Sequence, residues 1–317
     1  PFGVAPVGGS LWIWPGSERY LASMAFRRRI PYCMPCLTSA RLETVAEITK
    51  GMGWYQLYAP NDTAICDDIV HRADLSNYAV LVFTVDVPRP GRRDRYYKAI
   101  GEFKRFNLLA WWRTGFRPAW MLAALHNKFT RIDSIQRYQS KSKKVEIGDF
   151  VGRESDGGLI KLSWEYLARL RDQWKRPLVV KGIMHPEDAR RCQELGVDAV
   201  WISNHGARQL DAFPSTLAVL PEIRREVGDD YPLILDSGVR SGTDVMRALA
   251  LGADFVMLGR AFMFGVGALG RKGADHVADI IETQIVDTMV QIGINRLSDL
   301  TQDICLLPTD LMSGAIP

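Results

Sequence analysis

Short runs of apolar residues alternate with longer amphipathic stretches along most of the chain. The apolar runs are nearly continuous rather than alternating, as is typical of parallel strands covered on both faces. Eight runs are expected to be strands: Phe2–Val7, Pro31–Pro35, Trp54–Tyr58, Val80–Val85, Leu178–Lys181, Ala199–Ile202, Leu233–Leu235 and Phe255–Leu258. The expected helices are Ser17–Arg29, Leu42–Lys50, Asn61–Arg72, Trp164–Trp174, Pro186–Leu195, Thr216–Val227, Thr243–Leu251 and His276–Ile292. Repeated strand–helix units of this kind predict an α/β fold, a (β/α)8 TIM barrel.

Several expected helices begin with residues that are typical of helix starts. Asn61 and Ser163 precede their helices as caps, and Pro186 stands at a first helical position. An open doubly wound sheet is the alternative architecture, and it predicts a glycine-rich fingerprint after the first strand. The segment Pro6–Ser10 lacks the G-x-G-x-x-G spacing, so the closed barrel is favoured.

One connection, over about residues 87–162, is much longer than the others. Connections of that length within a compact domain are usually functional or disordered. We therefore expect a single domain over residues 1–317 with an insertion after the fourth strand. The chain starts at Pro1, without methionine, and enters an apolar strand at once, which suggests that the native protein has further residues upstream.

The composition, with 47% hydrophobic and 24% charged residues, is that of a globular protein. No apolar run has the length of a membrane span, and no segment has the layout of a signal peptide. The five cysteines are odd in number and scattered, which favours a reducing, cytoplasmic location. Cys33 and Cys36 form a C-x-x-C pair without a second ligand pair, so we interpret them as small side chains at a strand end and expect no metal site.

The insertion is strongly basic and rich in aromatic residues. Residues 92–153 contain fifteen Lys and Arg against five Asp and Glu, together with Trp111, Trp112, Phe116 and Trp120. This mixture suits the interface of a membrane with anionic lipids. A solvated lid whose aromatic side chains pack on the barrel is the alternative. Single-stranded nucleic acid would accept a similar mixture but is the least favoured partner, so none is expected.

Polar and ionisable residues follow the expected strands at the points where the strands end. In a parallel barrel these ends meet at one mouth, where active sites form. The residues concerned are Gln56, Tyr58, Thr84, Asp86, Lys181, Ser203, His205, Arg208, Asp236, Gly238, Arg240, Gly259 and Arg260. Any one of them alone would be unremarkable, and their convergence on one rim predicts a site.

Two groups within this set indicate particular chemistry. His205 is a candidate general base, and Asp86 is within reach to orient it. Arg208, three residues after His205, suits a substrate with a carboxylate next to the reacting carbon, and Arg93 at the start of the insertion is a second candidate.

The turns after the last two strands have the character of a phosphate site. The segments Asp236–Arg240 and Gly259–Arg260 supply small residues, exposed amide groups and two guanidinium groups. Barrels of this kind often bind a phosphate after strands seven and eight. Plain turns with solvated arginines are the alternative.

The segment Lys181–Arg260 closely resembles the FMN-dependent α-hydroxy-acid oxidases and dehydrogenases, which include glycolate oxidase, L-lactate dehydrogenase and mandelate dehydrogenase. The motif SNHGARQLD at 203–211 is the most specific part of the resemblance. Supporting matches are QLY at 56–58, TVD at 84–86, GRR at 91–93, VKG at 180–182, DSGVR at 236–240 and GR at 259–260. The likeness extends from Pro1 to about Leu300 and is weakest in the insertion.

The resemblance implies FMN as cofactor and the oxidation of a small L-2-hydroxy acid to the 2-keto acid. His205 then takes a proton from the substrate, and Asp86 stabilises the resulting imidazolium. Arg208 and Arg93 bind the carboxylate, while Tyr58 hydrogen-bonds the hydroxyl. The cofactor contacts implied are Gln56, Thr84 and Ser203 at the flavin ring, Lys181 at its N1/O2 edge, Asp236 at the ribityl chain, and Gly238, Arg240, Gly259 and Arg260 at the phosphate.

The chain departs from the family pattern at the end of the second strand. Pro35 and Cys36 stand where the family usually has two small polar residues near the flavin, and proline has no amide hydrogen to donate. Pro35 is therefore not expected to donate an amide hydrogen bond to the flavin.

The favoured function is a dehydrogenase that passes electrons to a membrane quinone through the basic insertion. It would be a homotetramer, either cytoplasmic or peripheral on the inner face of the membrane. An oxygen-using hydroxy-acid oxidase and a catalytically silent flavin-binding subunit are the alternatives. An isomerase that uses reduced flavin is disfavoured by the pair His205 and Arg208.

Overall fold

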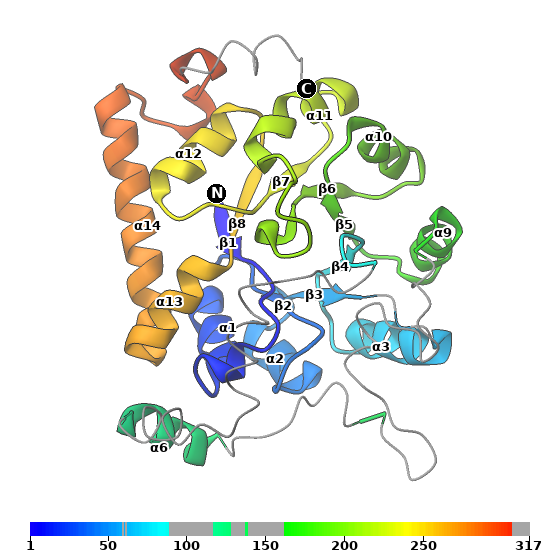
Figure 1. Ribbon diagram of the computed structural model, residues 1–317, viewed down its shortest axis with the longest axis vertical. Coiled ribbons are helices and arrows are strands. Elements are labelled where there is room, and N and C mark those ends of the chain that lie inside the picture. The colour runs from blue at the N-terminus through cyan, green and yellow to red at the C-terminus, as the bar shows by residue number, and fades with distance from the viewer. Residues whose placement is uncertain (59, 61, 89–116, 128–136, 139–161, 306–317) are drawn as a thin grey trace.

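The computed structural model describes residues 1–58, 60, 62–88, 117–127, 137–138 and 162–305. Within them, parallel strands form an eight-stranded sheet in the order β1-β8-β7-β6-β5-β4-β3-β2. A parallel bridge between Val4 and Tyr32 joins the first strand to the second and so connects the two ends of the sheet. Helices surround the strands on the outside (Figure 1). The expected TIM barrel is confirmed.

The strands lie where the apolar runs predicted them. Their bounds are β1 (Phe2–Val4), β2 (Cys33–Met34), β3 (Trp54–Leu57), β4 (Val80–Thr84), β5 (Leu178–Ile183), β6 (Ala199–Ile202), β7 (Leu233–Leu235) and β8 (Phe255–Leu258). Strand β1 is shorter than expected and ends before Pro6, which has no amide hydrogen for the ladder. Strand β5 is longer than expected and shifts register between Lys181 and Ile183.

The expected helices are also present, but their ends differ, most at the last helix, which begins at Arg271 instead of His276. They are α1 (Ser17–Arg28), α2 (Leu42–Thr49), α3 (Thr63–Leu75), α9 (Trp164–Gln173), α10 (Pro186–Glu194), α11 (Thr216–Val227), α12 (Gly242–Ala250) and α14 (Arg271–Ile292). Ser163 caps α9 as expected, by accepting from the amide of Tyr166 at 3.2 Å. Helix α3 is capped by Asp62, whose carboxylate accepts from the amide of Ala64 at 3.0 Å; Asn61 lies outside the described residues.

In the described part of the chain, two helices were not predicted. Helix α13 (Arg260–Leu269) follows β8 directly and is almost entirely apolar, so it has no amphipathic pattern. It packs tightly on α14, because a Cβ added at Gly273 would lie 1.8 Å from the carbonyl oxygen of Gly265. Helix α6 (Pro118–His126) belongs to the insertion. Short 3-10 turns complete the described elements: η1 (Ser10–Trp12), η2 (His205–Ala207), η3 (Leu297–Asp299) and η4 (Gln302–Ile304).

The cysteines of the C-x-x-C pair are buried free thiols. Cys33 belongs to a small apolar cluster with Val82, Val179 and Trp201, which side chains of several strands form. Burial raises the pKa of both thiols, and that of Cys36 rises to about 11. Both are therefore protonated and unreactive at neutral pH, which agrees with the interpretation as packed side chains. Among the described helices, none is both long and apolar enough to cross a membrane.

Candidate active site

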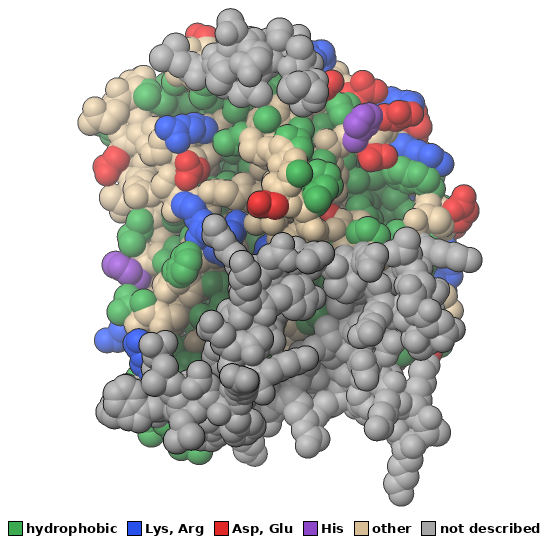
Figure 2. Space-filling view, viewed as in Figure 1, with side chains coloured by type: hydrophobic (Ala, Val, Ile, Leu, Met, Phe, Trp, Pro, Cys, Tyr) green, Lys and Arg blue, Asp and Glu red, His purple; other side chains and the backbone are tan. Residues whose placement is uncertain are grey.

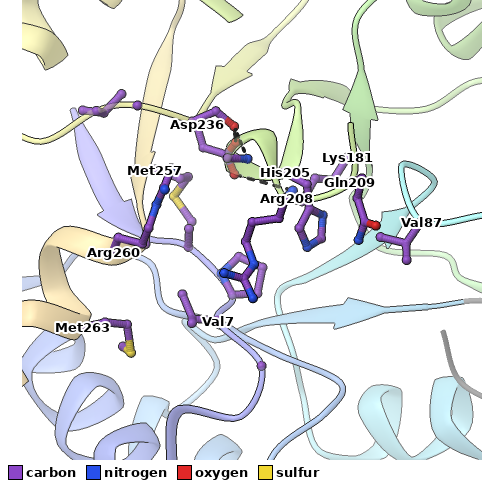
Figure 3. Close-up of a pocket in the computed structure, with 18 of the residues that line it drawn as sticks. Val7, Val87, Lys181, His205, Arg208, Gln209, Asp236, Met257, Arg260 and Met263 are labelled. Atoms are coloured by element: carbon purple, nitrogen blue, oxygen red, sulfur yellow. Dashed lines mark hydrogen bonds and ion pairs between the residues drawn. The ribbon is translucent and has the colours of Figure 1, made fainter. Parts of the chain in front are cut away.

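The carboxyl ends of the strands open onto a cavity of about 630 Å³. Many of the residues expected from the sequence line it: Tyr58, Lys181, His205, Arg208, Asp236, Gly238, Arg240, Gly259 and Arg260. They come from the ends of β3, β5, β6, β7 and β8 and from the loops that follow (Figure 3). The fold therefore brings together residues that are up to about two hundred positions apart in the chain.

The remaining expected residues are mostly buried close to this cavity. Gln56, Thr84 and Ser203 are buried, and so is the Asp86 side chain. Arg93 lies outside the described residues, so its expected contact with the substrate stays a prediction.

His205 and Asp86 form a hydrogen-bonded pair, with 2.8 Å between the imidazole Nδ1 and the carboxylate Oδ1. Burial alone would raise the pKa of Asp86, but the Lys181 charge and the His205 hydrogen bond outweigh it and hold this pKa below its usual value. Asp86 is therefore ionised at neutral pH and can only accept, so Nδ1 carries the hydrogen. The other ring nitrogen, Nε2, is then the one that can take a proton.

A glycine allows Asp86 to approach the end of β5. Gly182 has a φ of +107°, and a Cβ at this position would lie 2.5 Å from the Cβ of Asp86. Any side chain there would displace the carboxylate that orients His205. The glycine of the VKG motif at 180–182 is thus needed to leave room for the Asp86 side chain.

Lys181 is a buried cation at the centre of the site. Its Nζ donates to the hydroxyl of Ser203 at 2.8 Å and lies 3.6 Å from carboxylate oxygens of both Asp86 and Asp236. Burial alone would lower the pKa of Lys181, but the two carboxylates outweigh it and raise the pKa above its usual value. The ammonium group is therefore a permanent positive charge held by negative neighbours.

Trp201 Nε1 and Asp86 Oδ2 have no hydrogen-bond partner in the described part of the chain, although Asp86 Oδ2 lies 3.6 Å from Lys181 Nζ. Gln56 Nε2 and Thr84 Oγ1, also buried beside this centre, likewise have none. The amide of Cys36 donates to Gln56 Oε1 at 3.1 Å, which turns the NH2 group of Gln56 toward the unpartnered side. Leaving such groups unpaired costs about 1–3 kcal/mol each, so a polar ligand is expected to meet them. The edge of a flavin ring, with its carbonyl oxygens and ring nitrogens, fits a neighbouring amide donor and hydroxyl.

The hydrogen bond from the Cys36 amide to Gln56 shows what Cys36 contributes at this unusual position. The Cys36 amide is engaged by Gln56, and the Cys36 side chain is fully buried. Cys36 therefore acts on the cavity through the orientation of Gln56.

The other end of the cavity is positively charged. Arg240 and Arg260 both line it, and Arg260 opens helix α13, whose N-terminal amides carry partial positive charge. Burial and the nearby charge of Arg260 lower the pKa of Arg240. Figure 2 shows cationic side chains grouped near the middle of the visible face. Two close guanidinium groups at a helix N-terminus are suited to a dianionic phosphate.

Arg208 lies between these two ends. It follows η2, lines the cavity, and its guanidinium group extends into the open space beside His205 in Figure 3. Tyr58 lines the same cavity from the end of β3. A carboxylate bound by Arg208 would therefore place the adjacent carbon of a small acid near the imidazole.

Several lining residues were not predicted: Ala5, Pro6, Val7, Gly8, Ile13, Leu37, Val87, Gln209, Ser237, Val239, Met257, Met263 and Phe264. Met263 and Phe264 belong to α13, which the sequence pattern did not reveal. The loop after β1 was tested only for a dinucleotide fingerprint, although its position after a strand was itself a signal. Ser237 lies inside the DSGVR motif and was missed because only charged and glycine positions were considered there.

Comparison with known proteins adds independent findings. The family model described as FMN-dependent dehydrogenase matches residues 1–307. L-lactate dehydrogenase of Pseudomonas syringae pv. syringae (strain B728a) is 34% identical over 307 residues, which cover 96% of this chain and 80% of that protein. L-lactate dehydrogenase of Actinobacillus pleuropneumoniae serotype 5b (strain L20) is also 34% identical, over 306 residues, 96% of this chain and 79% of the relative.

Solved structures that resemble this chain also include enzymes that are named for a 2-hydroxy acid. (S)-mandelate dehydrogenase, a monotopic membrane protein, superimposes with a TM-score of 0.83 at 32% identity, over 96% of this chain and 80% of that one. A mandelate oxidase variant with bound (S)-mandelic acid superimposes with a TM-score of 0.73 at 29% identity, over 95% of this chain and 77% of that one. Similar structures thus include both dehydrogenases and oxidases.

Proposed function

The chain belongs to the FMN-dependent dehydrogenase family, and from this membership and the site geometry we propose how it oxidises a small L-2-hydroxy acid to the 2-keto acid. The observation that carries the proposal is the pairing of His205 with Asp86 at 2.8 Å, in a cavity that Arg208 also lines. A base beside a carboxylate-binding group is what removal of two hydrogens from a 2-hydroxy acid requires. Lactate and mandelate, named for the relatives, are the first substrates to test.

In this mechanism the side chains bind the acid and move one proton. Arg208 binds the substrate carboxylate, and Arg93 is proposed to join it. Tyr58 hydrogen-bonds the hydroxyl, and His205 takes a proton at Nε2. Asp86, already ionised, stabilises the imidazolium across its 2.8 Å hydrogen bond. FMN, when bound, supplies the acceptor for the electron pair and the α-hydrogen that leave the substrate.

The cofactor would be held along the length of the cavity. We assign Gln56, Thr84 and Ser203 to the flavin ring, Lys181 to the edge that gains negative charge, and Asp236 to the ribityl chain. The phosphate would be held by Gly238, Arg240, Gly259 and Arg260. The fixed charge of Lys181 favours a ring that has gained electrons.

Anaerobic bleaching of the bound flavin tests this proposal. Lactate or mandelate is expected to bleach the yellow colour, whereas 2-propanol and 1-phenylethanol, which have a methyl group in place of the carboxylate, are expected to leave it. The reason is that Arg208 can orient only the acids. A yellow protein that no 2-hydroxy acid bleaches would instead support a silent flavin-binding subunit.

We propose a membrane quinone as the electron acceptor, and a homotetramer on the inner face of the membrane. Within the described part of the insertion, α6 has exposed apolar side chains: Leu122 is 66% and Leu125 75% exposed. A structurally similar relative is a monotopic membrane protein. Release of hydrogen peroxide at the full turnover rate would show that oxygen is the acceptor.

Flotation with lipid vesicles tests the membrane association. The protein is expected to float with vesicles that contain anionic lipid, and the double variant Leu122→Glu/Leu125→Glu to float less, because two apolar contacts become acidic. Val290→Glu is the matched control, since Val290 is 69% exposed and lies near the end of α14 that is remote from α6 (Figure 1). Equal flotation of all three proteins would contradict a role of α6.

A further inference from the structure

The turn that carries His205 has a left-handed backbone over three consecutive residues. His205, Gly206 and Ala207 have φ values of +56°, +66° and +57°. Residues other than glycine adopt this conformation only where the surroundings hold them in it. The position of the imidazole therefore depends on whatever fixes this turn.

Hydroxyl and amide side chains on both sides of the turn fix its backbone. Ser203 Oγ accepts from the amide of His205 at 3.1 Å, and Asn204 Oδ1 accepts from the amide of Ala207 at 3.1 Å. Ser237 Oγ, from the loop after β7, accepts from the amides of Gly206 at 3.0 Å and Asn204 at 3.3 Å. Ser237 is thus the member of this group that ties the turn to a different loop.

Ser237 itself is in an unfavourable conformation, with a φ of +75°. Glycine would adopt this φ without strain, so a serine here indicates that the hydroxyl has a use. Its hydrogen is donated to Asp236 Oδ1 at 2.7 Å, which leaves the oxygen lone pairs to accept from the turn.

The contacts of Ser237 extend to the imidazole by a second route. Asp236 Oδ2 lies 3.6 Å from the Nζ of Lys181, which lies 3.6 Å from Asp86 Oδ2. Asp86 Oδ1 then holds His205 Nδ1 at 2.8 Å. Through Ser237, one network therefore joins the backbone on both sides of His205 to the His205 side chain.

We propose that Ser237 is a positioning residue, whose hydroxyl holds the His205 turn in the geometry needed for proton removal. The proposal rests on His205 being the base, as proposed above. It accounts for a strained serine at a position where the strain alone would favour glycine.

Two variants separate the hydroxyl from the backbone conformation. Ser237→Ala and Ser237→Gly both remove the hydroxyl, but only glycine relieves the positive φ. We expect both to slow maximal anaerobic flavin bleaching by about tenfold to a hundredfold, because small misplacements of a catalytic group have effects of that size. The glycine variant is expected to have the higher Tm of the two. Both should keep the FMN absorption spectrum, and the KM for the acid should change little.

A merely structural role predicts a different result. In that case the glycine variant, free of strain, would bleach at the wild-type rate, and this outcome would overturn the proposal. Arg29→Gly is the control, since Arg29 also has a positive φ, +55°, but ends helix α1 on the surface. It should keep the wild-type rate.

A third variant, His205→Ala, shows which idea is at fault. If it bleaches at the normal rate, the proposed base is wrong. If it is slow while Ser237→Gly is normal, only the role of Ser237 is wrong.

Discussion

His205→Gln enzyme is expected to oxidise 2-hydroxy acids about a hundredfold to ten-thousandfold more slowly than the wild type, which is the usual contribution of a general base. Glutamine keeps a side chain of similar reach that still contacts Asp86, but it cannot take a proton. The FMN content should not change, because the cofactor contacts that we assign do not include the imidazole. Stopped-flow bleaching under anaerobic conditions measures the rate.

The control for this prediction is His71→Gln, on the exposed side of helix α3. It should leave both the rate and the flavin spectrum unchanged. A normal bleaching rate in the His205 variant would move the base to another residue. Loss of flavin from that variant would instead show that the imidazole turn is part of the cofactor site.

Lys181→Met is expected to lower the free energy of unfolding by about 3–5 kcal/mol, the usual effect of removing one partner from a buried ion pair. Methionine fills most of the volume, but Asp86 and Asp236 then face each other without the cation that lies 3.6 Å from both. Denaturant unfolding of the FMN-free protein measures the loss. Lys175→Met, at an exposed position just before β5, is the control and should change little.

The pH dependence of stability gives a second test of this cluster. The pKa of Asp86 is lowered on folding, so its contribution is present above the unfolded-state pKa and is lost as pH falls through the folded-state pKa. The pKa of Lys181 is raised, so its contribution is lost as pH rises through the folded-state value. Wild-type stability from this cluster should therefore be complete around neutral pH.

Adding Asp236→Asn to Lys181→Met should recover part of the free energy of unfolding that Lys181→Met loses. No recovery would show that repulsion between the Asp86 and Asp236 carboxylates does not cause that loss.

The barrel could be predicted from the sequence because parallel strands that are buried on both faces consist of short, nearly continuous apolar runs. Phe255–Leu258 and Ala199–Ile202 were placed to the residue, since turn-forming residues bound them on both sides. Helix α13 escaped prediction for the opposite reason: it is apolar on every side and contains two glycines, so it has neither a polar face nor high helix propensity.

The sequence predicted that polar residues at the strand ends meet at one cavity, but only a few of the contacts between them. That His205 and Asp86 belong together follows from strand ends sharing one rim, and the structure confirms their contact at 2.8 Å. The strained φ of Ser237 and the orientation of Gln56 by Cys36 depend on loop geometry, which no periodicity records. Arg93 lies outside the described residues, so sequence remains its only support.

The contact between Gly265 and Gly273 links the cationic end of the cavity to the outside of the molecule. Helix α13 begins with Arg260 at the cavity and is pressed, backbone on backbone, against α14 one and a half turns later. The Val277 side chain of α14 also lies against Gly265, so the two helices have little room to change their spacing there. We therefore expect a displacement of α14 to move α13 as well, and with it the guanidinium group of Arg260 that we assign to the phosphate. The position of this outer helix would then affect how the cofactor is held.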